Sequence, residues 1–170
     1  MAYVALNGYK AYGFLPTGHA GVVIKDDSGM YSFYDFGAKH SSKSGFTKLN
    51  KETSSANTDY RKVDLGKNLT DEELGNALSQ YFPDNDSMSF YWKSGNANEA
   101  INYITGRAKT NINNYNGFSN NCSSEAECAM EAAGIDFDGA VPSIKVPAWN
   151  TPENSRKYEW KRTVTPESEQ

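Results

Sequence analysis

The sequence is poor in the residues that build metal sites and disulfide frameworks. Its 170 residues include two cysteines and two histidines. These residues form neither a Cys-x-x-Cys motif nor a closely spaced histidine pair, which are the spacings typical of zinc sites. Cys122 and Cys128 fall on one predicted helix and point in different directions, so a disulfide between them is not expected. The sequence therefore predicts no metal, no cofactor and no disulfide scaffold.

Long apolar runs and an excess of basic charge are also missing. No run approaches the roughly 20 apolar residues of a membrane span, and no basic-then-apolar leader opens the chain. The net charge is −4, which argues against a nucleic-acid partner. No glycine-rich phosphate-binding loop is found either. We therefore expect neither a transmembrane segment nor a signal peptide. The protein should be made in the cytoplasm, and any export should follow a route that needs no cleaved leader.

Composition and length indicate one aromatic-rich domain. The sequence has 11 tyrosines and 8 phenylalanines while leucine, isoleucine and valine are sparse, so its core should depend on aromatic side chains. A chain of this length can bury about 70% of its unfolded surface as a single domain. We predict one domain over residues 1–150 and a charged C-terminal tail, partly disordered, over residues 151–170.

The apolar patterns predict strands and helices in mixed order. Strands are predicted over residues 2–6, 18–24, 30–37, 58–65 and 87–93. Helices are predicted near residues 70–81, 97–109 and 122–133. The polar turn after residue 24 predicts a hairpin, and Thr70 with Glu73 forms a capping box at a helix start. The fold class that follows is α+β, with a mostly antiparallel sheet and helices packed on it.

The segment from Asn120 to Gly134 is the first candidate for chemistry. Asn120 or Asn121 can cap a helix whose first turn carries Cys122, and Gly134 can end it. Free amides and the helix dipole at such a position stabilise a thiolate. The small residues of the predicted stripe are Cys122, Ala126, Ala129 and Ala133. They would let the helix lie close to a sheet, so the sequence also allows a purely structural, buried cysteine here.

His19 is the second candidate, because it opens the predicted strand over residues 18–24. A polar residue across the hairpin can hold its imidazole in one tautomer, as in a catalytic triad. Asp35 is the first candidate for that position and Ser32 the second, since the hairpin register is not determined by the sequence. The alternatives are a histidine satisfied in the core and an Asp35 carboxylate that faces water.

Two segments carry a resemblance to a known superfamily. Gly18–Ile24 and Tyr115–Ser124, followed by Ala133-Gly134-Ile135, resemble the circularly permuted papain-like enzymes, in which the histidine strand precedes the Asn-Cys helix. That superfamily includes the lecithin–retinol acyltransferase type and permuted relatives of NlpC-type cell-wall peptidases. The resemblance covers roughly residues 3–149 and is strongest to bacterial toxin or secretion-system effector domains. It implies a permuted papain-like fold with the catalytic cysteine at a helix N-terminus.

The resemblance also implies roles for single residues. It assigns the nucleophile to Cys122 and the base to His19. Many relatives have a histidine at the third position, which falls on Phe33 here, with Asp35 or Ser32 nearby. The oxyanion would be held by the Cys122 amide, and the binding candidates are Asn120, Asn121 and Ser32. Glu125, three residues after the cysteine, disfavours a thiolate unless His19 is charged or Glu125 turns away.

The function implied is a cysteine-dependent amide hydrolase. A peptidoglycan peptide is the preferred substrate, with a lipid ester second and a host-protein amide third. No basic amphipathic helix is found that would hold a membrane surface, which argues against the lipid. An effector of this kind also implies an immunity protein as partner. The rival class is a non-catalytic binding domain that keeps the fold without the chemistry.

Overall fold

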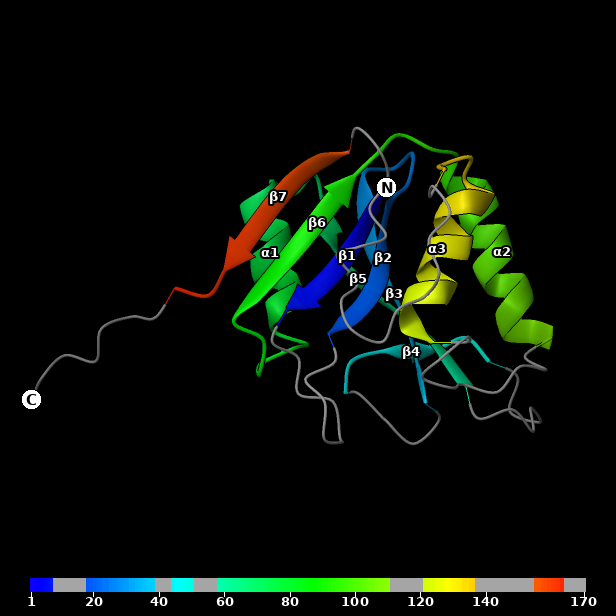
Figure 1. Cartoon of the computed structure of the whole chain (residues 1–170), viewed down its shortest axis with the longest axis horizontal. Coiled ribbons are helices and arrows are strands. Elements are labelled where there is room, and N and C mark those ends of the chain that lie inside the picture. The colour runs from blue at the N-terminus through cyan, green and yellow to red at the C-terminus, as the bar shows by residue number, and fades with distance from the viewer. Residues whose placement is uncertain (8–17, 39–43, 51–57, 111–120, 137–154, 164–170) are drawn as a thin grey trace, which may run out of the picture.

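The computed structural model describes residues 1–7, 18–38, 44–50, 58–110, 121–136 and 155–163. Within them, seven strands form one sheet in the order β4-β5-β3-β2-β1-β6-β7, and every neighbouring pair is antiparallel (Figure 1). The strands are β1 (Ala2–Asn7), β2 (His19–Lys25), β3 (Met30–Ala38), β4 (Thr47–Lys48), β5 (Thr58–Lys67), β6 (Ser87–Trp92) and β7 (Arg156–Lys161). The helices are α1 (Asp71–Ser79), α2 (Ala97–Thr110) and α3 (Cys122–Ala132). The predicted α+β class is confirmed.

The sheet is covered on both faces. Leu74 and Leu78 of α1 pack on one face, whereas α3, with α2 beside it, packs on the other (Figure 1). Successive residues of a strand point to opposite faces, so Val22 belongs to the core under α3 and Val23 to the core under α1. Burial on both sides explains why β2 is a nearly continuous apolar run.

The hairpin of β2 and β3 has a register that the sequence left open. Gly21 pairs with Asp35 across the two strands, so Asp35 lies on the same face as Gly21 and His19. The turn is held by Asp26, whose Oδ1 accepts hydrogen bonds from the amides of Ser28 and Met30 at 2.8 and 3.0 Å. The predicted hairpin is confirmed, and its register brings the first-choice acid next to the histidine.

The three predicted helices are confirmed with ends close to those expected. Thr70 and Glu73 make the predicted capping box, with Glu73 N to Thr70 Oγ1 at 3.2 Å and Thr70 N to Glu73 Oε2 at 2.8 Å. Gly134 follows α3 with a φ of 79°, a conformation that glycine adopts without strain. No helix of the described residues is sufficiently long and apolar to traverse a membrane. The second histidine of the chain, His40, lies outside the described residues.

The charged C-terminal segment contributes a strand that is not predicted from the sequence. The sequence predicts a tail over residues 151–170, yet β7 lies within this segment and pairs with β6 along the sheet edge. Trp160 is 5% exposed and packs on α1, where a Cβ at Gly75 would come within 2.3 Å of the indole. Its Nε1 donates a hydrogen bond to Asn76 Oδ1 at 2.8 Å. An edge strand buries few of its side chains, so a charged composition is compatible with it.

Replacing Trp160 by alanine tests this strand. We expect Trp160→Ala to lower the free energy of unfolding by about 3–5 kcal/mol, because a buried indole and its hydrogen bond are both lost. Lys161→Ala on the same strand is the matched control, since Lys161 is exposed and should change stability by less than about 0.5 kcal/mol. Urea unfolding followed by circular dichroism measures both. Equal midpoints for the two variants would show that β7 adds nothing to the fold.

Candidate active site

The start of α3 positions Cys122. Asn121 is the N-cap, and its Oδ1 accepts a hydrogen bond from Ser124 N at 3.0 Å while Ser124 Oγ accepts one from Asn121 N at 2.9 Å. Cys122 is therefore the first helical residue, and its amide is among those without a partner inside the helix. Its side chain is 7% exposed and belongs to the core that α3 forms with β2.

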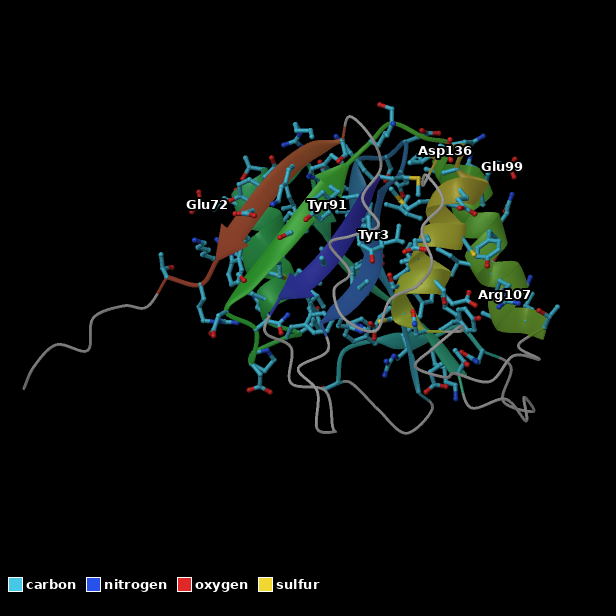
Figure 2. All side chains as sticks on the ribbon, viewed as in Figure 1. Tyr3, Glu72, Tyr91, Glu99, Arg107 and Asp136 are labelled. Carbon is cyan, nitrogen blue, oxygen red and sulfur yellow. The ribbon has the colours of Figure 1, made fainter. Side chains whose placement is uncertain are left out.

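A buried network fixes this first turn to the sheet. The Tyr3 hydroxyl on β1 lies 2.8 Å from Ser123 Oγ, and Ser123 Oγ donates to Glu127 Oε1 at 3.1 Å. Figure 2 shows Tyr3 on the sheet surface that faces α3. Because Ser123 follows Cys122 directly, the network limits how far the sulfur can move relative to the strands.

His19 and Cys122 meet where β2 begins. The His19 side chain lies close enough to Cys122 for its charge and a hydrogen bond to lower the pKa of the thiol, and a hydrogen bond from the Ala20 amide lowers that pKa further. His19 Nε2 hydrogen-bonds with Asp35 Oδ1. Since Nε2 is engaged by the carboxylate, Nδ1 is the ring nitrogen left to face the sulfur. The structure thus brings together the three residues that the sequence put first: Cys122, His19 and Asp35.

The chain of polar contacts continues beyond Asp35. Arg61 on β5 pairs directly with Asp35 in the sheet, and its Nη2 lies 2.8 Å from Asp35 Oδ2. Asp35 is 0% exposed and Arg61 4%. The two oxygens of one buried carboxylate are therefore divided between an imidazole and a guanidinium.

Aromatic rings enclose the imidazole from the α1 side. The Phe82 ring lies 5.9 Å from the His19 ring, and Phe33 meets Phe82 edge-on at 5.7 Å. Phe33 also lies over Gly21, where a Cβ would come within 2.4 Å of the ring. These contacts restrict rotation of His19 and exclude water from one side of it.

The charges of the cluster reinforce one another. Burial lowers the pKa of His19, but the negative charges of Asp35 and Cys122 outweigh burial and raise that pKa from 6.5 to about 9. Burial also raises the pKa of the Cys122 thiol, and the charge and hydrogen bond of His19 outweigh it and lower that pKa. A thiolate beside an imidazolium is the state that both shifts favour at neutral pH.

Glu125 turns away from the sulfur, as a thiolate requires. Its carboxylate is paired with Arg107, with Nη2 to Oε1 at 2.5 Å and Nε to Oε2 at 3.4 Å. Figure 2 shows Arg107 near the C-terminal end of α2, beside α3. The ion pair compensates the carboxylate, and the charges that act on the pKa of Cys122 are those of His19, which lowers it, and Asp35, which raises it.

The predictions for three further residues of this region meet different outcomes. Ser32 is wrong as the residue that orients His19: it pairs with Ile24, lies on the opposite face from Asp35, and its Oγ donates to Asp64 Oδ1 at 2.6 Å. Asn120 lies outside the described residues. Asn121 uses its side-chain oxygen as a helix cap, so its part in binding an oxyanion stays a prediction.

The second cysteine has none of these partners. Cys128 is exposed and lies off the buried stripe of α3, as predicted. Partial burial and nearby carboxylates raise the pKa of its thiol despite a hydrogen bond with Tyr103. Both cysteines are free. Cys128 provides an internal reference for the reactivity of Cys122.

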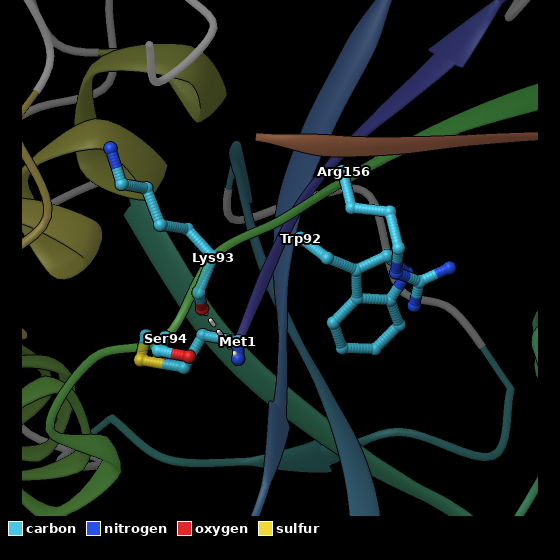
Figure 3. Close-up of a pocket in the computed structure, with 5 residues that line it drawn as sticks. All are labelled: Met1, Trp92, Lys93, Ser94 and Arg156. Carbon is cyan, nitrogen blue, oxygen red and sulfur yellow. Dashed lines mark hydrogen bonds between the residues drawn. The ribbon is translucent and has the colours of Figure 1, made fainter. Parts of the chain in front are cut away.

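A surface pocket lies away from this site. It has a volume of about 270 Å³ and is lined by Met1, Trp92, Lys93, Ser94 and Arg156 (Figure 3). β1 runs from Ala2, opposite Trp92, to Leu6, opposite His19, so the pocket and the histidine lie toward opposite ends of that strand. Arg156 is already paired with Asp71. The pocket is therefore separate from the Cys122–His19 pair.

Comparison with known proteins shows the fold. No protein-family model matches the chain, and no curated protein sequence matches it. A crystal structure of the type VI secretion system effector TseH is similar, with a TM-score of 0.69 over 94% of this chain and 91% of that chain. Sequence identity is 17%, so the similarity establishes a shared α+β architecture and not a shared chemistry.

Proposed function

We propose that this chain is a cysteine-dependent amide hydrolase with a circularly permuted papain-like fold. In this proposal Cys122 is the nucleophile, His19 the general base and Asp35 the residue that orients His19. One arrangement carries it: Cys122 opens a helix beside a buried imidazole that is itself bonded to a buried carboxylate, and the interaction of the two side chains lowers the pKa of Cys122 and raises that of His19. A structural cysteine has no need of a carboxylate behind its histidine neighbour, so the Asp35 contact supports catalysis.

The chemistry proposed is acyl transfer through a thioester. The Cys122 thiolate attacks the amide carbonyl carbon, and the Cys122 amide at the helix start donates to the oxyanion. The imidazolium of His19 gives its proton to the leaving nitrogen as the C–N bond breaks. Water then attacks the thioester carbon while His19 takes a proton from it. The C–S bond breaks, the acid product leaves and the thiolate is restored.

We propose a peptidoglycan peptide as the substrate and a secreted bacterial effector as the biological role. The His19 and Cys122 segments resemble cell-wall peptidases, and the similar fold of TseH, described as a type VI secretion system effector, supports the role by analogy of fold. A toxic hydrolase of this kind requires an immunity protein in the producing cell.

Alkylation of the two thiols tests the proposal without knowledge of the substrate. With iodoacetamide at pH 7, we expect Cys122 to react at least ten times faster than Cys128, because the pKa of Cys122 is lowered and that of Cys128 is raised. His19→Ala should remove the advantage, whereas Cys128→Ala should leave it intact. Peptide mass spectrometry measures both rates. Equal, slow labelling of the two thiols would instead favour the non-catalytic binding domain.

A further inference from the structure

Arg61 is a buried cation that the proposed mechanism does not use. It lies on β5, two strands away from His19 in the sheet. Its side chain is 5% exposed, and its guanidinium carbon lies 6.0 Å from the centre of the Phe46 ring. A cation buried this deeply is stable only with close compensation, which here comes from Asp35 at 2.8 Å.

We propose that Arg61 is a positioning residue of the active site: it holds one oxygen of Asp35 and remains its counter-ion throughout the reaction, so that the other oxygen stays on His19. The inference rests on the proposed function, which it deepens. It assigns the cluster four members on four elements, namely Cys122 on α3, His19 on β2, Asp35 on β3 and Arg61 on β5.

The first argument is the balance of charge. Asp35 is fully buried, so its negative charge needs a positive partner at every step. His19 cannot be that partner throughout, because it must lose its proton to the leaving group and then accept one from water. An arginine guanidinium, in contrast, is always charged in proteins. The guanidinium therefore compensates Asp35 during the interval in which the imidazole is neutral.

The second argument is geometric. Asp35 and Arg61 are directly opposite in the β3–β5 register, which is the closest approach that two strands offer to side chains. The guanidinium engages Oδ2 while the imidazole engages Oδ1. With both oxygens engaged, the carboxylate cannot rotate about its Cβ–Cγ bond without breaking a contact. His19 is thereby held with Nε2 on the carboxylate and Nδ1 toward the sulfur.

Neighbouring ions do not replace Arg61. Lys48 on β4 and Asp59 on β5 lie beside it and pair with each other at 3.3 Å. From α1 and the turn after it, the group packed on the cluster is the apolar ring of Phe82. On the α3 side, Glu127 is engaged with Ser123. Among the described residues, Arg61 is the cation paired with Asp35 besides His19.

The test is the pH dependence of Cys122 alkylation in Arg61→Gln. When a buried positive charge is lost, His19 and Cys122 give up their protons less readily. The midpoint of the pH profile of Cys122 alkylation should therefore move up by about one pH unit or more. Arg156→Gln is the matched control, because it also removes one paired arginine charge but lies toward the far end of the sheet. Its midpoint should equal that of the wild type.

The possible results separate the two proposals. If wild-type Cys122 labels no faster than Cys128, the proposed function fails. If wild-type labelling is fast and the Arg61→Gln midpoint is unmoved, only the positioning role of Arg61 is overturned. Should Arg61→Gln not fold, Arg61→Lys keeps the charge but loses the planar fork. It should then label at least threefold more slowly than wild type at pH 7, and an unchanged rate would overturn the role.

Discussion

Cys122→Ala is expected to abolish the release of soluble peptides from purified sacculi, with a loss of at least about 10⁴-fold. The reason is that the acyl intermediate forms on the Cys122 sulfur, and the second thiol cannot replace it because Cys128 is exposed and its pKa is raised. Cys128→Ala should retain full activity. Chromatography of the released material with time measures each variant, and recovery of new amino termini would show that an amide bond was cut.

His19→Ala should lose activity to a similar extent, and the double variant Cys122→Ala/His19→Ala should lose no more than either single one. Groups that act as a unit in one step are strongly non-additive when removed. If the loss of activity in the double variant equals the product of the two single losses, the two side chains serve different functions despite their contact.

The same assay decides among the substrates. Phospholipid vesicles incubated in parallel test for a lipid ester, and released fatty acid in place of peptides would move the assignment to the lecithin–retinol acyltransferase type. Release from sacculi that persists in Cys122→Ala would contradict a cysteine mechanism. Release from neither material, together with slow Cys122 labelling, would leave the binding domain as the better description.

The parts of the site that the sequence predicts are those encoded locally. The helix cap at Asn121, the position of Cys122 on the first turn and the glycine stop at Gly134 are all set within about 15 residues. The hairpin of β2 and β3 is similarly local, because a short polar turn joins its strands. For this reason Asp35 can be placed near His19 from the sequence, with the register as the remaining uncertainty.

The parts that are not predictable depend on strand order. Arg61 reaches Asp35 only because β5 pairs with β3, and nothing in a single sequence specifies that pairing. Ser32 was a plausible alternative because a register shift of one residue exchanges the faces of a strand. β7 is similar: its place beside β6 depends on Trp160 finding the surface of α1 across more than 80 residues of sequence.

Asp35→Asn is expected to reduce kcat/KM by about 10³-fold or more while leaving Cys122 in place. Two physical effects combine. The amide can turn its NH₂ group toward Nε2 of His19, which would favour the tautomer with the proton on Nδ1, and such an imidazole cannot accept the thiol proton. The negative charge that outweighs burial at His19 also disappears.

The pH dependence of Asp35→Asn has a defined sign. In the wild type the pKa of His19 is raised to about 9, so the imidazolium persists across neutral pH and hydrolysis should decline only as the pH rises through that value. Without the Asp35 charge, burial dominates and the pKa of His19 falls. The alkaline limb of hydrolysis then moves to lower pH, and the Cys122 thiolate, deprived of its imidazolium, forms only at higher pH.

This signature separates Asp35 from Arg61. Removing the anion moves the alkaline limb of hydrolysis down, whereas removing the cation in Arg61→Gln moves it up, because the two charges act on the His19 proton with opposite sign. A variant that only loses folded protein hydrolyses substrate more slowly, but the alkaline limb of its pH profile stays in place. Thermal unfolding of each variant followed by circular dichroism identifies that case. An Asp35→Asn enzyme that is folded and retains the wild-type pH profile would show that the buried carboxylate is structural, and that Cys122 and His19 operate as a pair without it.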